Sequence, residues 1–317
     1  MNLIDLHCDT FYRIKECSTT QNIIKNQLHI DLEKLKSARS YLQCFALYSD
    51  IKACEEKGID PWYYILELYA LIKDEIENAN GLIEVARSIK NADEIHKKGH
   101  LAALLTVEDG GIIYEDMKRL ETLHKMGVRM MSLTWDYSNS LGHPNLPESS
   151  AKGLTKFGHD VIAHMNTLGM IVDVSHLSDK GFWEVMHESN KPVVASHSNA
   201  RAVMDHRRNL SDEMIRTLAE NGGVMGLNFC PYFVSNKGEK LHVEDLVKHV
   251  AHIRNIGGAE VMSIGTDFDG MNGDLEIQHI GQIEKLAFGL SKAGFSDDDI
   301  EKLFYKNARR LMCDVIG

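Results

Sequence analysis

The sequence predicts an α/β protein with the architecture of a (β/α)8, or TIM, barrel. Three features of its 317 residues support this prediction. Apolar segments of strand length alternate along the chain with longer amphipathic segments of helix length. There are eight strand candidates, which is the number that closes such a barrel. Several of them are almost continuously apolar, such as residues 102–107, and such runs are typical of parallel strands covered on both sides.

The strand and helix candidates follow one another in the order that a barrel requires. Strands are predicted at residues 3–8, 41–48, 101–107, 129–134, 170–174, 193–196, 223–228 and 261–265. Helices are predicted at residues 60–80, 114–126, 155–168, 178–188, 211–220, 243–255 and 296–311. Gly127, Gly169 and Gly257 stand where helices should end before the next strand. A doubly wound open sheet is the alternative fold, and the absence of a GxGxxG turn after the first strand argues against it.

Composition and charge narrow the range of functions. Pro and Gly are spread along the chain, which favours one domain over residues 1–317. The net charge of −11 argues against a nucleic-acid partner, because phosphates call for a basic surface. The sequence holds no apolar run of about 18 residues that could span a membrane, so no membrane association is expected. Its N-terminus lacks the features of a secretory signal, so we expect a cytoplasmic protein. The 6 cysteines are scattered without a CxxC pair and are expected to be free thiols. The oligomeric state is left open, with a homodimer as one alternative.

Polar residues suited to metal binding follow the first and third strand candidates. His7 and Asp9 are two positions apart, so both side chains can point to the same side of the first strand. An imidazole and a carboxylate are suitable zinc ligands, although such a pair alone more often has a surface or capping role. Glu108 directly follows an apolar strand, where a carboxylate is poorly placed for burial unless it is paired or binds a metal. The alternative is a turn at Asp109-Gly110 that leaves Glu108 in solvent.

Three further clusters of polar residues follow later strands. His176 and His197 lie at the ends of neighbouring strand candidates, where two histidines are harder to explain as packing residues than one. Asp267 follows the last strand, in a segment for which an Asx-type turn is the alternative. All five clusters fall at the C-terminal ends of strands, which is the face where barrel enzymes carry their active sites. Their combination predicts a metal site. Most other histidines, His249 among them, fall in helices or their flanks and are expected to be surface or packing residues.

Six segments of the chain together resemble the membrane (renal) dipeptidase family of the amidohydrolase superfamily. They are DLHCDT at 5–10, TVEDGG at 106–111, DVSHLS at 173–178, VASHSNAR at 194–201, RRNL at 207–210 and GTDFDG at 265–270. The resemblance covers nearly the whole chain and implies a barrel of the metallo-dependent hydrolase type with two zinc ions. By similarity, His7, Asp9 and Glu108 would bind one ion. Glu108, His176 and His197 would bind the other, so that Glu108 bridges the two.

The resemblance also implies roles for residues around the metals. Arg208 would hold the C-terminal carboxylate of the substrate, an anion that suits a planar guanidinium. Asp267 would be a catalytic carboxylate beside the attacking water, together with the bridging Glu108. Better-known members have His after Leu-Thr on the fourth strand, whereas Trp135 stands there in this chain. No oxyanion histidine is therefore expected. We interpret Trp135 as an apolar wall of the pocket, with an indole N–H donor as the alternative.

The function that the resemblance implies is that of a zinc-dependent dipeptidase acting on small-molecule dipeptides. Zinc would lower the pKa of a water molecule and polarise the peptide carbonyl, and Asp267 would accept the proton of the water. A D-residue is expected to be tolerated at the C-terminal position of the dipeptide. The alternatives are a related amidohydrolase that acts on other small amides or lactones, and a catalytically silent barrel that serves as a scaffold.

Overall fold

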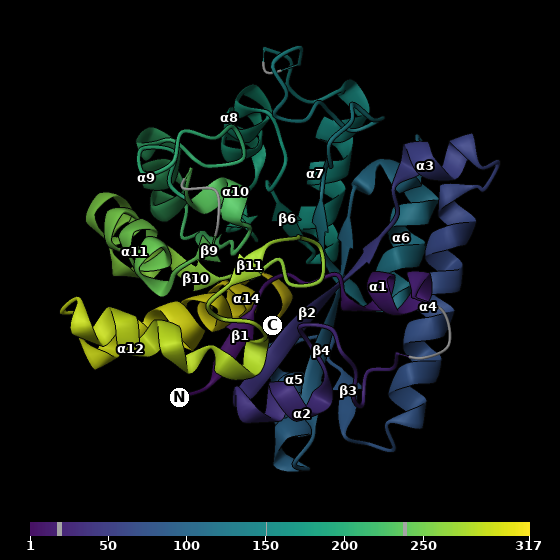
Figure 1. The fold of residues 1–317 in the computed structure, drawn as a ribbon. Helices are drawn as coiled ribbons and strands as arrows, with labels where there is room; N and C mark the ends of the chain where they lie inside the picture. Colours follow the sequence, from purple (N-terminus) through teal and green to yellow (C-terminus); the bar gives the residue numbers. More distant parts are fainter. Residues whose placement is uncertain (18–20, 150, 237–239) are drawn as a thin grey trace.

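Eight parallel strands close into a barrel in the computed structural model, which describes residues 1–17, 21–149, 151–236 and 240–317. The strands of the ring are β1 (Leu3–Asp5), β2 (Ser40–Tyr48), β4 (Leu101–Glu108), β5 (Val128–Ser132), β6 (Ile171–Asp173), β7 (Val194–Ala195), β8 (Val224–Leu227) and β10 (Met262–Ile264). Neighbours pair in the order β2-β1-β10-β8-β7-β6-β5-β4, and a pairing between β2 and β4 closes the ring. Helices surround the strands (Figure 1). The predicted (β/α)8 barrel is confirmed, and the doubly wound alternative is wrong.

The predicted helices form with small shifts at their ends. They are α4 (Pro61–Asn78), α6 (Met117–Met126), α7 (Lys156–Leu168), α8 (Asp179–Glu188), α9 (Asp212–Glu220) and α11 (Val243–Gly257). Side-chain caps fix several N-termini, as where Thr155 accepts from the N–H of Gly158. Gly127 and Gly169 end their helices with positive φ as expected. The end of α11 differs, because Gly257 is still helical and Gly258 takes the positive φ of 83°.

The last predicted helix, 296–311, forms and extends to Ile316, with a π-helical turn inside it. It consists of α13 (Asp297–Glu301), a π-helical turn (Lys302–Lys306) and α14 (Asn307–Ile316). The short elements α1 (Thr10–Glu16), α2 (Leu32–Ser37), α3 (Ile51–Glu56), α5 (Ile89–Lys97), α10 (Pro231–Val234) and α12 (Glu284–Lys292) were not predicted. Neither were β3 (Ile83–Val85), which pairs with β4 outside the ring, nor the small sheet of β9 (Lys240–Leu241) and β11 (Asp274–Leu275). Most of these segments are too short to show a period in the sequence.

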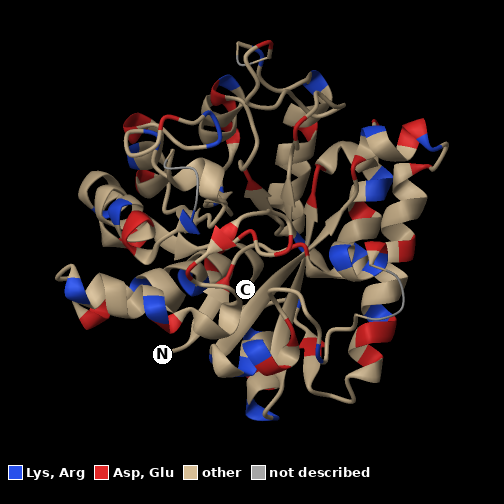
Figure 2. Cartoon of the chain, in the orientation of Figure 1, with Lys and Arg blue, Asp and Glu red and all other residues tan. Residues whose placement is uncertain are grey.

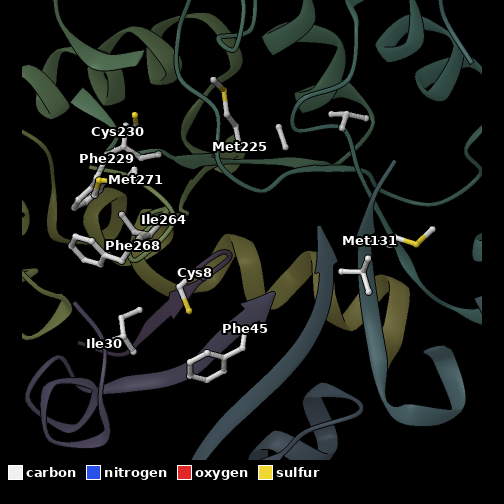
Figure 3. Packing of buried hydrophobic residues seen from close by; sticks show 14 of the residues in the cluster. Cys8, Ile30, Phe45, Met131, Met225, Phe229, Cys230, Ile264, Phe268 and Met271 are labelled. Atoms are coloured by element: carbon white, nitrogen blue, oxygen red, sulfur yellow. The ribbon is translucent and has the colours of Figure 1, made fainter. Parts of the chain in front are cut away.

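The end of the barrel opposite the C-terminal ends of its strands is filled by an apolar cluster, and the C-terminal helix contributes to this cluster. Every strand of the ring except β10 supplies a fully or almost fully buried residue to it, for example Ile4, Leu104 and Val224. Leu311 and Met312 of α14 belong to the same cluster. A second cluster lies between strands and outer helices, and Figure 3 shows part of it. The barrel is therefore a packed core and not a pore, which leaves the C-terminal ends of the strands for chemistry.

Two expectations about the whole chain concern cysteines and membranes. The 6 cysteines are all free, as predicted, and Cys17 and Cys313 are the exposed ones. Among the described residues, no helix has both the length and the apolar character that crossing a bilayer requires.

His249 in α11 illustrates the structural role expected for most histidines. The residue is fully buried. Its Nδ1 accepts from the N–H of Ala200 at 3.1 Å, and its Nε2 donates to the carbonyl of Val234 at 3.0 Å. These two partners fit a neutral ring, since a charged ring would turn an N–H against the N–H of Ala200. Burial lowers the pKa of His249 to about 4.

We predict that His249 makes the protein less stable as the pH falls from 6.5, the usual pKa, to about 4. In this window the unfolded chain binds the proton and the folded chain does not, so acid favours unfolding by at most about 1.4 kcal/mol per pH unit. Urea unfolding between pH 7 and pH 4 should therefore show a shallower loss of stability in His249→Gln than in the wild type. Parallel curves for the two proteins would contradict this assignment.

Candidate metal centre

His7 and Asp9 lie just beyond β1, and their side chains meet. The Nε2 atom of His7 is 3.1 Å from Oδ2 of Asp9. Asp9 precedes helix α1 but does not cap it with its side chain, so its carboxylate remains available to the barrel mouth. The backbone N–H of Asp9 donates to the carbonyl of Phe268, which ties the segment to the loop after β10. The spacing of two residues therefore places both side chains on the same side, as the sequence predicts.

Glu108 occupies the centre of the group. It is the last residue of β4, and its two oxygens face different histidines. Oε2 lies 3.5 Å from Nε2 of His7, and Oε1 lies 2.9 Å from Nε2 of His176 and 3.5 Å from Nε2 of His197. The chain does turn at Asp109-Gly110, but Glu108 is 5% exposed, so the alternative that leaves it in solvent is wrong. The structure thus brings together all five residues predicted as ligands.

The donor set fits one or more divalent cations. Among the described residues, two groups have ligand atoms within 4.8 Å of one another: His7, Glu108 and His197, and His7, Asp9 and Asp267. Oδ1 of Asp9 is buried without a hydrogen-bond partner, which is costly for a carboxylate unless a cation compensates. Imidazole nitrogens and carboxylate oxygens at this spacing suit zinc, a borderline-soft ion.

The electrostatics of the cluster also favour the binding of a cation. Burial, and then the neighbouring carboxylates, raise the pKa of Asp9 to about 7. Burial also raises the pKa of Asp267. Burial would raise the pKa of Glu108 too, but the charges of His7 and His176 hold it well below its usual value. Buried carboxylates therefore depend on nearby positive charge, which protons on imidazoles or a bound cation can supply.

Several residues at the strand ends have a backbone conformation that is rare for non-glycine residues. Asp109, His176, Asp267 and Asp269 have φ values of 69°, 68°, 62° and 70°. Such conformations are held in place by surrounding structure and cluster at functional sites. Acidic residues mark the loops at the centre of Figure 2, over the barrel mouth.

A cavity of about 410 Å³ opens above the cluster. Glu108, Asp9, His176 and Arg208 are among the residues that line it. Arg208 is 5% exposed, and its Nε and Nη2 atoms have no hydrogen-bond partner. Its guanidinium carbon lies 5.3 Å from the ring centroid of Phe233. A buried guanidinium with two free N–H positions in a cavity is ready to receive a carboxylate.

The loop that carries Arg208 is held by polar contacts of residues 199–210, both among themselves and with neighbouring elements. Both terminal nitrogens of Arg201 donate to the carboxylate of Asp179 at 2.7 Å. The backbone N–H of Arg201 donates to the carbonyl of Leu210. Asn209 is fully buried and donates to the carbonyls of Met204 and Phe233. These contacts fix the position of Arg208 relative to the barrel.

The two aspartates after β10 have different surroundings. Asp267 lies near the cluster, with Oδ1 at 3.9 Å from Nε2 of His7. Its Oδ2 accepts from Nδ2 of Asn228 at 2.9 Å. Asp269 is held by the Thr10 hydroxyl at 2.6 Å and by the N–H of His29 at 2.8 Å. Asp267 is thus the better placed of the two to act on a substrate, whereas Asp269 connects loops.

Trp135 lies in the cavity wall among other aromatic side chains. Its ring centroid is 5.2 Å from that of Tyr48, 5.6 Å from that of Tyr137 and 6.2 Å from that of His176. The tilted and edge-on ring contacts are those of packing side chains. This placement is compatible with a wall and with an N–H donor, so the role of Trp135 stays a prediction.

Some residues of the site could not be recognised from the sequence. Asp136 is one of them, and its Oδ1 lies 3.2 Å from Nδ1 of His176. Asn228, which contacts Asp267, is another. Both belong to loops after strands other than those of their partners, so no spacing in the sequence connects each pair. Only a residue such as Asp136 could have been expected on general grounds, since histidines that bind metals usually donate a hydrogen bond to a carboxylate.

Comparisons with known proteins give a consistent result. A model of the membrane dipeptidase family, peptidase family M19, matches residues 1–316. Dipeptidase verJ of Clonostachys rogersoniana is 30% identical over 302 residues, which are 90% of this chain and 76% of that protein. Dipeptidase tcpJ of Claviceps purpurea is 27% identical over 294 residues, which are 90% of this chain and 69% of that protein.

Solved structures share the fold. A metallopeptidase of family M19, called dipeptidase AC, has a TM-score of 0.92 at 25% identity, over 100% of this chain and 99% of that one. A metallopeptidase from Rhodobacter sphaeroides, solved with a phosphinate mimic of the dipeptide L-Ala-D-Ala, has a TM-score of 0.91 at 24% identity, with 99% of both chains covered.

Gly270 offers a test of the geometry that does not depend on activity. A Cβ atom at Gly270 would lie 2.2 Å from Oδ2 of Asp9 and 2.8 Å from Oδ1 of Asp267, so Gly270→Ala must displace these carboxylates. We predict a loss of about 10- to 100-fold in zinc affinity, measured by competition with a chelator. The matched control is Gly142→Ala, whose Cβ would lie 3.4 Å from the nearest atom, on Leu154. Wild-type affinity in Gly270→Ala would contradict the placement of the metal beside Asp9.

Proposed function

This chain belongs to the membrane dipeptidase family, peptidase family M19, and from that premise we propose that it is a zinc-dependent dipeptidase. The observation that carries the proposal is the convergence of buried imidazoles and carboxylates on Glu108, below a cavity into which Arg208 offers free N–H groups. Two relatives that bear the name dipeptidase, verJ and tcpJ, add support.

We propose two zinc ions per chain. His7, Asp9 and Glu108 would hold one, and Glu108, His176 and His197 the other, because each oxygen of Glu108 faces a different part of the cluster. When bound, the ions would supply Lewis acidity for the carbonyl and lower the pKa of the attacking water. The chain's own residues bind and orient the substrate and move the proton.

Arg208 would bind the C-terminal carboxylate of the dipeptide. Its two unpartnered nitrogens, Nε and Nη2, can both donate to one carboxylate, and burial strengthens that contact. The short span between Arg208 and the ligand cluster would favour dipeptides over longer peptides. Because the peptide bond and the carboxylate would be held and the second side chain would not, a D-residue at the C-terminal position should be tolerated.

Asp267 would be the general base. Asn228 donates to Oδ2 and leaves Oδ1 free to accept the proton of the attacking water. Burial raises the pKa of Asp267. Oδ1 would then return the proton to the leaving amine. Trp135 would limit the width of the cavity beside His176.

The proposed function is tested with a panel of substrates at fixed zinc concentration, with and without a chelator. We expect hydrolysis of L,L and L,D dipeptides and loss of activity with the chelator, restored by added zinc. Dipeptide amides, which lack the terminal carboxylate, should be poor substrates. Hydrolysis of small amides or lactones in place of dipeptides would favour the related amidohydrolase, and an inert but metal-loaded protein would favour a scaffold.

We predict that Arg208→Ala raises KM for dipeptides by roughly 10- to 100-fold, since hydrogen bonds between charged groups contribute about 1.5–3 kcal/mol. Arg208→Lys should restore little of the affinity, because an ammonium lacks the two-pronged guanidinium geometry. Zinc content serves as the control and should stay unchanged in both variants. An unchanged KM in Arg208→Ala would exclude the proposed carboxylate contact.

We predict that Asp267→Asn, which keeps the shape of the side chain but cannot accept the proton, lowers kcat by about 100- to 10,000-fold with near-normal zinc binding. Asp269→Asn is the matched comparison and should have the smaller effect on kcat, because Asp269 contacts Thr10 and His29 instead of the ligand cluster. If Asp267→Asn keeps kcat while Asp269→Asn loses it, the base is Asp269.

A further inference from the structure

A buried polar network lies behind the ring of His197, at the ring nitrogen that does not face Glu108. Nδ1 of His197 is 2.7 Å from Oγ of Ser196, and Oγ of Ser196 donates to Oδ2 of Asp173. Oδ1 of Asp173 accepts the backbone N–H groups of Ser175 and Ser196, both at 2.9 Å. Asp173, the most exposed of these four residues, is 3% exposed. The network is thus closed to solvent.

The hydrogen positions in this network follow from donor and acceptor capacity. An ionised carboxylate can only accept, so the one hydroxyl hydrogen of Ser196 points to Asp173. Ser196 Oγ then presents lone pairs to Nδ1 of His197, and this nitrogen must carry a hydrogen. A neutral imidazole has one N–H. Nε2 of His197 is therefore unprotonated, and it faces Oε1 of Glu108 at 3.5 Å and Nε2 of His176 at 3.0 Å.

We infer that Asp173 and Ser196 are positioning residues that hold His197 in the tautomer whose Nε2 can bind a metal ion. This inference rests on the metal site proposed above. Groups behind a ligating histidine fix its ring orientation and its tautomer, and their removal typically weakens metal binding by about 10- to 100-fold. Here the carboxylate acts through a serine hydroxyl instead of contacting the imidazole directly.

The neighbouring ligand candidate, His176, is supported differently. Its Nδ1 contacts Asp136, whose side chain is 40% exposed, so water can replace that carboxylate. Water has no such access to Ser196, which is fully buried. Removal of the Ser196 hydroxyl would leave the Nδ1–H of His197 unpaired in the interior, which is unfavourable. A shift of the proton to Nε2 would avoid this cost and would block metal binding.

Cobalt(II) is a suitable probe, because it reports on each site by absorption without any substrate. The experiment compares the two cobalt dissociation constants of the wild type, Ser196→Ala and Ser175→Ala, together with their thermal unfolding. Ser175 is the matched control, since its hydroxyl lies 3.2 Å from Oγ of Ser196 in the same network and accepts the backbone N–H of His197, whereas Ser196 contacts the ring. We expect Ser196→Ala to weaken one of the two sites by about 10- to 100-fold and Ser175→Ala to weaken neither.

Asp173→Asn provides a second test with a nearly isosteric side chain. The two N–H groups at Oδ1 fix the amide so that its NH2 faces Ser196. Ser196 must then accept from Asn, and its own hydrogen can turn either to Ser175 or to Nδ1 of His197. In the Ser175→Ala background only the second route is left, and it places the ring proton on Nε2. We expect the loss in cobalt affinity from Asp173→Asn to be larger in that background than in the wild type.

Three results would overturn the inference: wild-type cobalt affinities in Ser196→Ala, equal weakening of both sites by Ser196→Ala, or the same loss from Asp173→Asn in both backgrounds. A failure of the proposed function would look different, because the wild type itself would then bind no cobalt or hydrolyse no dipeptide.

Discussion

The contact between the carboxylate of Glu108 and the surrounding imidazoles is the interaction on which the rest of the site depends. Glu108 ends an apolar strand and is buried, and a lone carboxylate in such a place would be strongly disfavoured. Its oxygens lie within 2.9–3.5 Å of the Nε2 atoms of His7, His176 and His197, which come from the ends of three other strands. Any loss of one partner leaves buried charge behind. The positions of these strand ends are therefore bound to one another through Glu108.

The barrel makes this arrangement possible by separating packing from chemistry. At one end, α14 and the inward residues of most strands form an apolar core. At the other end, Asp109, His176, Asp267 and Asp269 have unusual backbone conformations, and the last three of them line the cavity. Support continues behind the ligand candidates, through Asp136 for His176 and through Ser196 and Asp173 for His197. His176 and His197 are thus held by further polar residues, of which Asp136 also lines the cavity.

The sequence predicted the ring of strands and the convergence of polar clusters at the strand ends because both follow from local patterns, whereas the resemblance to the family implied which five residues would be the ligands. An apolar run indicates each strand. The position of His7, Glu108 or His197 at the end of such a run is recognised without knowing which strands are neighbours in the barrel. Contacts between loops could not be predicted in this way. The roles of Asp136 and Asn228 can be recognised only when the positions of His176 and Asp267 are known. The short elements β3 and α10 depend on packing more than on the periodicity of the sequence. The π-helical turn inside the predicted helix 296–311 was likewise not predicted from the local pattern.

The central claim is that Glu108 is shared by two metal ions. The most direct measurement is anomalous X-ray scattering from crystals of the protein grown with zinc, combined with the zinc content of the same preparation. The account predicts two ions per chain, one on each side of the Glu108 carboxylate, with His7 and Asp9 at the first and His176 and His197 at the second. A single ion, or two ions that do not share Glu108, would contradict it.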